Sequence, residues 1–194
     1  MDVTSAVGSI LAAFGLSGAA GLNAWIPLLA TAALGRAGVI DLSAPYDGLE
    51  STPVLVALSV AFVADFVGDK VPVVDHVLHL AGTVVHPLAG ALVFAGSTSV
   101  ASDLPPVVGL LAGALVSGSL HAGRASVRPV STATTAGAGN PLLSLGEDIG
   151  AGVLTALAVL VPVLAVVVLA VAVVALLRAW RRLGRANRGR PART

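Results

Sequence analysis

The chain alternates long apolar stretches with short polar segments, a pattern typical of helices that cross a membrane. The longest apolar stretch, Val153 to Leu177, has 25 residues without a charge. At 1.5 Å per residue it would extend about 37 Å, which exceeds a hydrocarbon core of about 30 Å. We therefore expect this helix to tilt, to bend at Pro162 or to protrude from the bilayer.

This pattern predicts an all-α, polytopic membrane helix bundle with about six membrane elements, some of them broken. The first apolar stretch, Ser5 to Leu34, is too long for one ordinary span and is interrupted at Asn23 and Pro27. The segment 122–139 is either a cytoplasmic loop or a broken element that enters the membrane. The remaining elements are expected at Thr52–Gly68, Val73–Leu80 (a half-helix), Thr83–Ser97, Val107–His121 and Ile149–Leu177.

A weak internal repeat accompanies these elements. Three segments, Gly18–Leu29, Leu80–Leu92 and Thr135–Leu145, each carry small residues, then Asn or His, then Pro followed by Leu. The repeat fits either a helical hairpin used three times or an inverted arrangement of three plus three elements, as in many transporters.

Composition supports a membrane location. The chain is 56% hydrophobic and 11% charged, with a mean hydropathy of +0.95, whereas soluble domains carry about 25% charged residues. The absence of cysteine excludes disulfides, iron–sulfur clusters and cysteine-based zinc sites. No basic residue precedes the first apolar stretch, so we interpret it as a membrane helix and not as a signal peptide.

Basic residues are concentrated at the C-terminus, where seven of the eleven lie in the last seventeen positions. We therefore divide the chain into one transmembrane domain, 1–178, and a basic cytoplasmic tail, 179–194, that contacts anionic lipid; nucleic-acid binding is not expected. With six crossings, both termini are cytoplasmic in a bacterial inner membrane. Ten of the eleven basic residues then lie inside, and the loop 146–148 faces outside.

The stretch from Val63 to Pro87 contains three aspartates, one lysine and three of the four histidines, although apolar sequence surrounds it. A charge at the bilayer centre costs about 2.5–3.5 kcal/mol, so these groups need partners, water or a function. Asp65 and Asp69 lie at i and i+4 on one helix face, with Lys70 next to them. They are either a solvated helix end or an interior site for a proton or cation.

The spacing of Asp75, His76 and His79 places one carboxylate and two imidazoles within a turn of helix. These three residues are candidate metal ligands for Zn²⁺ or a similar ion, although no fourth ligand is specified. A proton or substrate relay, or simply an interfacial helix, is the alternative.

Further candidate site residues lie at helix breaks and in a basic segment. Asn23, His86 and Asn140 each accompany a proline that frees a backbone carbonyl, so they are expected to line a shared cavity. His121, Arg124 and Arg128 either mark the cytoplasmic side or bind an anionic group.

The motifs GLNAWIPLL and DKVPVVDHVLH resemble a family of small bacterial membrane proteins catalogued only as a domain of unknown function. The resemblance covers about Ser5 to Leu177 and implies a membrane protein, without an activity to transfer. Its motif positions are Asn23, Pro27, Asp69, Lys70, Pro72, Asp75 and His76.

These observations favour a transporter or channel for a small polar or ionic solute, formed as a homo-oligomer because small residues line the helix faces. One alternative is an intramembrane enzyme for a lipid-phosphate or prenyl substrate. In that case Asp65, Asp69 and Asp75 would bind Mg²⁺, and Arg124 or Arg128 would bind phosphate. The other alternative is a scaffold without catalytic activity.

Overall fold

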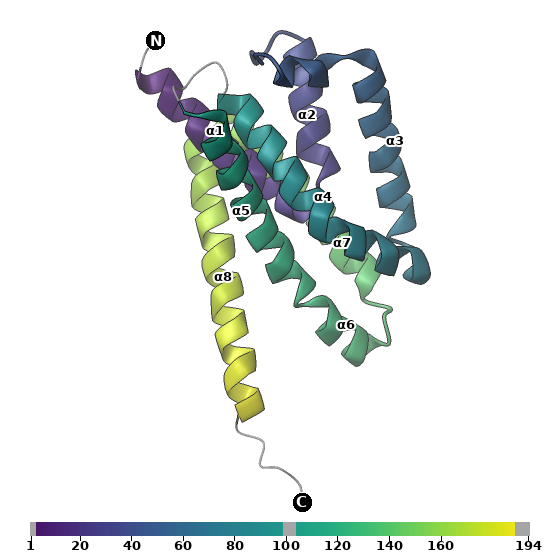
Figure 1. The fold of residues 1–194 in the computed structure, drawn as a ribbon. Helices are drawn as coiled ribbons and strands as arrows, with labels where there is room; N and C mark the ends of the chain where they lie inside the picture. The colour runs from purple at the N-terminus through teal and green to yellow at the C-terminus, as the bar shows by residue number, and fades with distance from the viewer. Residues whose placement is uncertain (1–2, 99–103, 189–194) are drawn as a thin grey trace, which may run out of the picture.

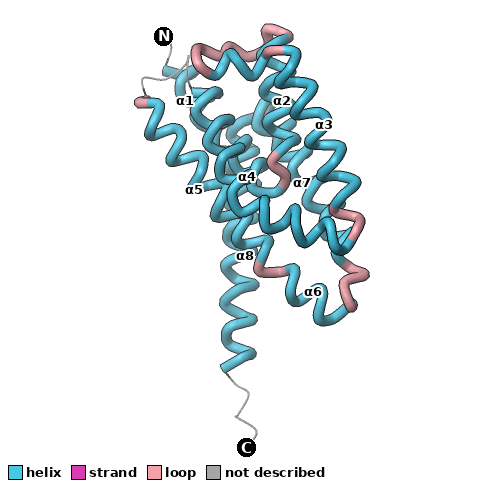
Figure 2. The backbone as a smooth tube through the Cα atoms, turned by 45° about the vertical axis from the view of Figure 1, so that its right-hand side comes forward, coloured by secondary structure: helices cyan, strands magenta, loops and turns pink. Residues whose placement is uncertain are grey.

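A computed structural model describes residues 3–98 and 104–188; the side chains of 3–5, 72–73, 75–76, 179–180 and 182–188 lie outside the description. All regular elements of the described chain are helices, which confirms the all-α prediction (Figures 1 and 2). The elements are α1 Val3–Leu22, α2 Trp25–Arg36, the short 3₁₀ helix η1 Tyr46–Glu50, α3 Thr52–Gly68, α4 Pro72–Thr98, α5 Pro106–Ala125, α6 Arg128–Thr135, α7 Asn140–Leu160 and α8 Pro162–Arg188.

Helix α1 is the central element of the bundle, since it packs against α2, α4, α5, α7 and α8. Its inward faces are built from small residues, and Ala13, Ala19 and Ala20 are completely buried. Small side chains allow neighbouring helices to approach closely on several sides. Helix α3 lies at the edge, where its main contacts among the described residues are with α2, η1 and α4 (Figure 1).

Large apolar side chains cover the outside of this bundle, while small and polar side chains fill much of the inside. Leu115, Leu142 and Leu160 are each at least 70% exposed, whereas Ser17 and Ser117 are completely buried. Three helices of the described chain are long and apolar enough to cross a membrane: Val77–Thr98 within α4, the continuous α5–α6 segment Pro106–Thr135, and α7. This inside-out distribution is typical of helices that pack in lipid.

The closest helix crossing joins α4 to α5. A Cβ atom built on Gly113 would lie 2.1 Å from the carbonyl oxygen of Gly90, and one built on Gly90 would lie 2.3 Å from Ser117 Cβ. The two backbones are therefore in direct contact, and glycine is required on both sides of the crossing.

Two predicted features of the region around α4 are wrong. The half-helix Val73–Leu80 and the break at His86-Pro87 do not exist, because α4 is continuous from Pro72 to Thr98 with Pro87 inside it. Hydroxyl groups from the neighbouring helices support this part of α4. Ser117 Oγ donates to the His86 carbonyl at 2.7 Å, and Ser17 Oγ donates to the Gly90 carbonyl at 3.0 Å.

The C-terminal third of the chain also differs from expectation. Asn140 does not interrupt a helix but begins α7, with Pro141 in the first turn. The N–H groups of a first turn make no intrahelical hydrogen bond, so a proline at this position loses none. The predicted helix Ile149–Leu177 is instead two helices, α7 and α8, divided at Val161, and this division confirms the bend expected at Pro162. The segment 122–139 contains the end of α5, the short α6 and a turn at 136–139.

The N-terminal end of α1 and the C-terminal end of α8 lie at opposite ends of the bundle (Figures 1 and 2). The reason is that α1 and α2 form a hairpin at the predicted Asn23 break, so this segment returns to the end from which it started. The prediction of both termini on one side assumed a single crossing here and does not agree with this arrangement. The three repeat segments adopt different backbone forms, so the repeat stays a prediction.

Replacing Gly113 by alanine should disrupt the α4–α5 crossing and lower the free energy of unfolding by about 1–3 kcal/mol or more, because overpacking forces the backbones apart. Thermal unfolding of the purified protein in detergent measures this. The control is Gly152→Ala in α7, where an added Cβ meets nothing within 4 Å. A Gly113→Ala protein as stable as the control would contradict the described contact.

Candidate functional site

Most of the polar candidates from the sequence meet at one end of the bundle. They come from the α1–α2 break, the end of α3, the first half of α4, the end of α5 and the start of α6, and residues of α7 join them. We call this group the charged cluster; its members are Asn23, Asp65, Asp69, Lys70, His79, His86, His121, Arg124, Arg128, Ser144, Glu147 and Asp148.

Arg124 on α5 holds the charged cluster together. Its Nη1 donates to the Leu22 carbonyl and to Glu147 Oε2, both at 2.6 Å, and its side chain is 13% exposed. The Leu22 carbonyl belongs to the last turn of α1, where no intrahelical donor is available. One guanidinium therefore satisfies the end of α1 and joins it to α5 and α7.

Two histidines lie against the same guanidinium and are stacked, with ring centroids 4.3 Å apart. His86 Nδ1 lies 2.5 Å from the Ala20 carbonyl, which can only accept, so the His86 proton is on Nδ1. His86 Nε2 then accepts from Arg124 Nη2 at 2.6 Å, which makes the ring neutral. His121 Nδ1 accepts from Arg124 Nε at 3.3 Å, and its buried Nε2 has no hydrogen-bond partner among the described atoms.

Glu147 on α7 lies between two arginines. Its Oε2 also accepts from Arg128 Nη2 at 2.9 Å, and the same nitrogen donates to Ser144 Oγ at 2.9 Å. The side chains of Arg128 and Glu147 are 10% and 15% exposed. Because guanidinium groups stay charged in proteins, this carboxylate is needed to compensate two nearly buried cations.

Asn23 organises the break between α1 and α2. Its Oδ1 accepts from the backbone N–H groups of Trp25 at 2.9 Å and Ile26 at 3.2 Å, which caps the otherwise unpaired start of α2. Its Nδ2 donates to Asp148 Oδ1 at 2.8 Å. The predicted helix break at Asn23 is thus confirmed, and its side chain joins α2 to α7.

Lys70 occupies the more exposed edge of the charged cluster. Its Nζ lies 2.6 Å from Asp69 Oδ1 and 3.8 Å from Asp148 Oδ2, and its side chain is 34% exposed. It also lies 3.9 Å from the centroid of the Phe66 ring, a cation–π distance. Lys70 therefore joins the end of α3 to α7 by weaker contacts than those of the arginines.

A polar cavity of about 30 Å³ lies in the middle of the charged cluster, lined by residues that include Asp65, His79 and His86. Such a volume has room for about one or two water molecules. Four carboxylates (Asp65, Asp69, Glu147 and Asp148) and three cations (Lys70, Arg124 and Arg128) surround it. With neutral histidines, these described groups carry one excess negative charge.

The comparisons with known proteins confirm the resemblance to a family catalogued only as a domain of unknown function. The family model described as Domain of unknown function (DUF4126) matches residues 10–182. The chain belongs to this family. No curated protein and no solved structure matches it.

The remaining predicted residues of this DUF4126 chain lie apart from the charged cluster or outside the description. Asn140 Nδ2 donates to Thr132 Oγ1 at 3.2 Å in the turn before α7, so Asn140 does not line the cavity. The side chains of Asp75 and His76 are not described, which leaves the metal site with His79 a prediction. Among the described residues, no group of three or more His, Asp or Glu is arranged to hold a metal ion.

Sequence reasoning missed the contribution of α7. Glu147 and Asp148 were predicted to lie in an outside loop, but they lie in the second turn of α7 at the same end as Arg124. A signal was present, since the buried positions Ser144, Ala151, Thr155 and Ala158 recur at helical spacing and Asp148 falls on the same face. Acids on such a face are expected to point inward.

Replacing Glu147 by glutamine should lower the free energy of unfolding by about 3 kcal/mol, because two nearly buried guanidinium groups lose their carboxylate. Denaturant or thermal unfolding in detergent measures the loss. Asp47→Asn is the matched control, since Asp47 is an exposed acid at the other end of the bundle and its replacement should change stability by less than about 0.5 kcal/mol. Equal stability of the two variants would show that Glu147 does not compensate the arginines.

Proposed function

We propose that this protein is a multi-pass membrane protein that moves a small ion or polar solute, and that the charged cluster is its binding and gating site. The observation that carries the proposal is the convergence of eight ionisable side chains, from α3, α4, α5, α6 and α7 or their ends, on the lining of one polar cavity. In an otherwise apolar bundle, buried ionisable groups of this kind mark ion or proton pathways more often than packing.

The membrane location rests on the surface of the bundle. Large apolar side chains cover its outside, and three helices are long and apolar enough to cross. Lys70, Arg124 and Arg128 lie at the same end as the basic part of α8, so the positive-inside rule places this end in the cytoplasm. In this orientation the N-terminal end of α1 faces the opposite side.

The excess of one carboxylate favours a cation or a proton as the moving species. A cluster with four carboxylates and three fixed cations gains a balanced charge by taking up one positive charge. The enzyme alternative is less well supported, because it assigned Arg124 and Arg128 to a phosphate. Both guanidinium groups are instead bound to Glu147 within the chain.

Flux measured in proteoliposomes tests the proposal. Proton flux is followed with a trapped pH-sensitive dye, and Na⁺, K⁺ and Cl⁻ currents are followed on a supported membrane. We expect one of these fluxes in the unmodified protein and a loss of about tenfold, equivalent to about 1.4 kcal/mol, in Asp65→Asn. This substitution removes the one excess negative charge of the charged cluster and should leave the unfolding temperature unchanged.

Asp47→Asn serves again as the control and should keep full flux. The transport proposal fails if none of the four ions crosses faster than in empty liposomes. It also fails if Asp65→Asn and His79→Ala both retain the flux of the unmodified protein while remaining folded.

A further inference from the structure

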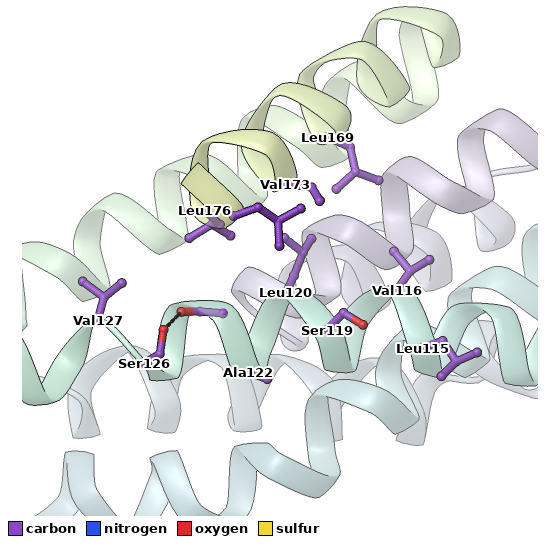
Figure 3. A pocket seen from close by; sticks show the side chains of 12 residues that line it. Leu115, Val116, Ser119, Leu120, Ala122, Ser126, Val127, Leu169, Val173 and Leu176 are labelled. Atoms are coloured by element: carbon purple, nitrogen blue, oxygen red, sulfur yellow. Dashed lines mark hydrogen bonds between the residues drawn. The ribbon is translucent and has the colours of Figure 1, made fainter. Parts of the chain in front are cut away.

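A second cavity lies on the side of the bundle, between α5 and α8. Its volume is about 590 Å³, and Leu115, Leu120, Val127, Leu169, Val173 and Leu176 are among its lining residues. Figure 3 shows Leu120 of α5 and Leu169, Val173 and Leu176 of α8 projecting into the space between the two helices. A volume of this size accommodates a ligand of several tens of atoms.

Polar side chains in this groove are few. Ser126 Oγ donates to the Gly123 carbonyl at 2.6 Å (Figure 3), and Ser119 is the other polar side chain of the described lining. The groove therefore offers an extended, mainly apolar surface. Only a ligand with a hydrocarbon chain gains binding energy from it, at about 0.8 kcal/mol for each buried CH₂ group.

The groove ends where the sequence of α8 turns from apolar to basic. Val173 and Leu177 line it at i and i+4, and Arg181 follows at i+8, on the same face of α8. Arg178 lies next to Leu177, and both arginines are exposed. An occupant that extends past Leu177 therefore meets positive charge.

We propose that this groove binds one anionic phospholipid, with an acyl chain along the apolar residues of α5 and α8 and its phosphate at Arg181 and Arg178. A second copy of the chain would fill the apolar part, but it would need an acidic group at this level to pair with the arginines. Of the described acids of this end, Asp69, Glu147 and Asp148 are paired with cations of the charged cluster, and Asp65 lines the polar cavity of that cluster. The inference depends on the membrane location of the bundle but not on its transport of a solute.

Native mass spectrometry of the full chain, released from detergent micelles, tests the inference. Delipidated protein is titrated with phosphatidylglycerol or with phosphatidylcholine of the same acyl chains. We expect one phosphatidylglycerol bound more tightly than phosphatidylcholine. Each arginine near the lipid phosphate contributes about 1 kcal/mol, equivalent to about fivefold in affinity.

Two kinds of variant separate the headgroup contacts from the acyl-chain contacts. Arg181→Gln should weaken phosphatidylglycerol about fivefold and phosphatidylcholine by less, because the choline group offsets the charge of its phosphate, whereas Arg181→Lys should keep the preference. Ser119→Trp places an indole in the groove and should weaken both lipids; Val173→Trp fills the same space from α8 if the first variant does not fold. Ser59→Trp, on the exposed face of α3, is the control.

Equal affinity for the two lipids in the unmodified protein would overturn the inference, as would unchanged lipid binding in both groove-filling variants. A dimer without bound lipid that Ser119→Trp converts to a monomer would assign the groove to a second copy and also overturn it. Lipid binding with the expected pattern in a protein without ion flux would support the inference and reject only the transport proposal.

Discussion

The buried guanidinium of Arg124 is the interaction on which the charged end of the bundle depends. A guanidinium stays protonated in proteins, so it cannot be buried unless acceptors surround it. Here the acceptors are the last-turn carbonyl of α1, a carboxylate of α7 and imidazoles of α4 and α5. Each acceptor fixes its own helix relative to the others, so one charge sets the packing of four helices at this end. His86 in turn must be neutral, since its Nε2 accepts a hydrogen bond from Arg124 and its Nδ1 donates one to the Ala20 carbonyl of α1.

The same requirement explains how α1 can end inside the bundle. A helix break leaves carbonyls on one side and N–H groups on the other, and at membrane depth protein groups have to satisfy both. Arg124 accounts for the Leu22 carbonyl and Asn23 accounts for the start of α2. Because Asn23 also donates to Asp148, the break is coupled to α7. The hairpin of α1 and α2 is thus a consequence of two side chains that belong to the charged cluster.

The sequence predicted much of this arrangement, and the errors have physical causes. The bounds of α3 and the break at Asn23 follow from local signals, Thr-Pro at a helix start and Asn before a proline-containing helix. Convergence of the acids and histidines was predicted because isolated charges are costly among apolar helices. The break expected at Pro87 was wrong because α4 continues through this proline where it packs against α1 and α5, and local sequence does not reveal such tertiary packing. Glu147 was misplaced because counting charges by loop treats an acid as a topology marker, whereas this one compensates arginines.

The contacts around the cavity differ in strength, and this difference bears on how a solute could enter. Arg124 and Arg128 are almost buried and share a carboxylate, so separating them from Glu147 exposes unpaired charges in a poor solvent. The Lys70 side chain is 34% exposed although its Nζ is buried, and the 3.8 Å between Nζ and Asp148 Oδ2 is longer than a hydrogen bond. Lys70 follows α3, which packs against few neighbours, and its contact with Asp148 is weaker than the short bonds of the arginines to Glu147. The wall made by α3 and Lys70 is therefore the part of the cluster that opens at the lowest free-energy cost, and access to Asp65 and the cavity is expected from that side.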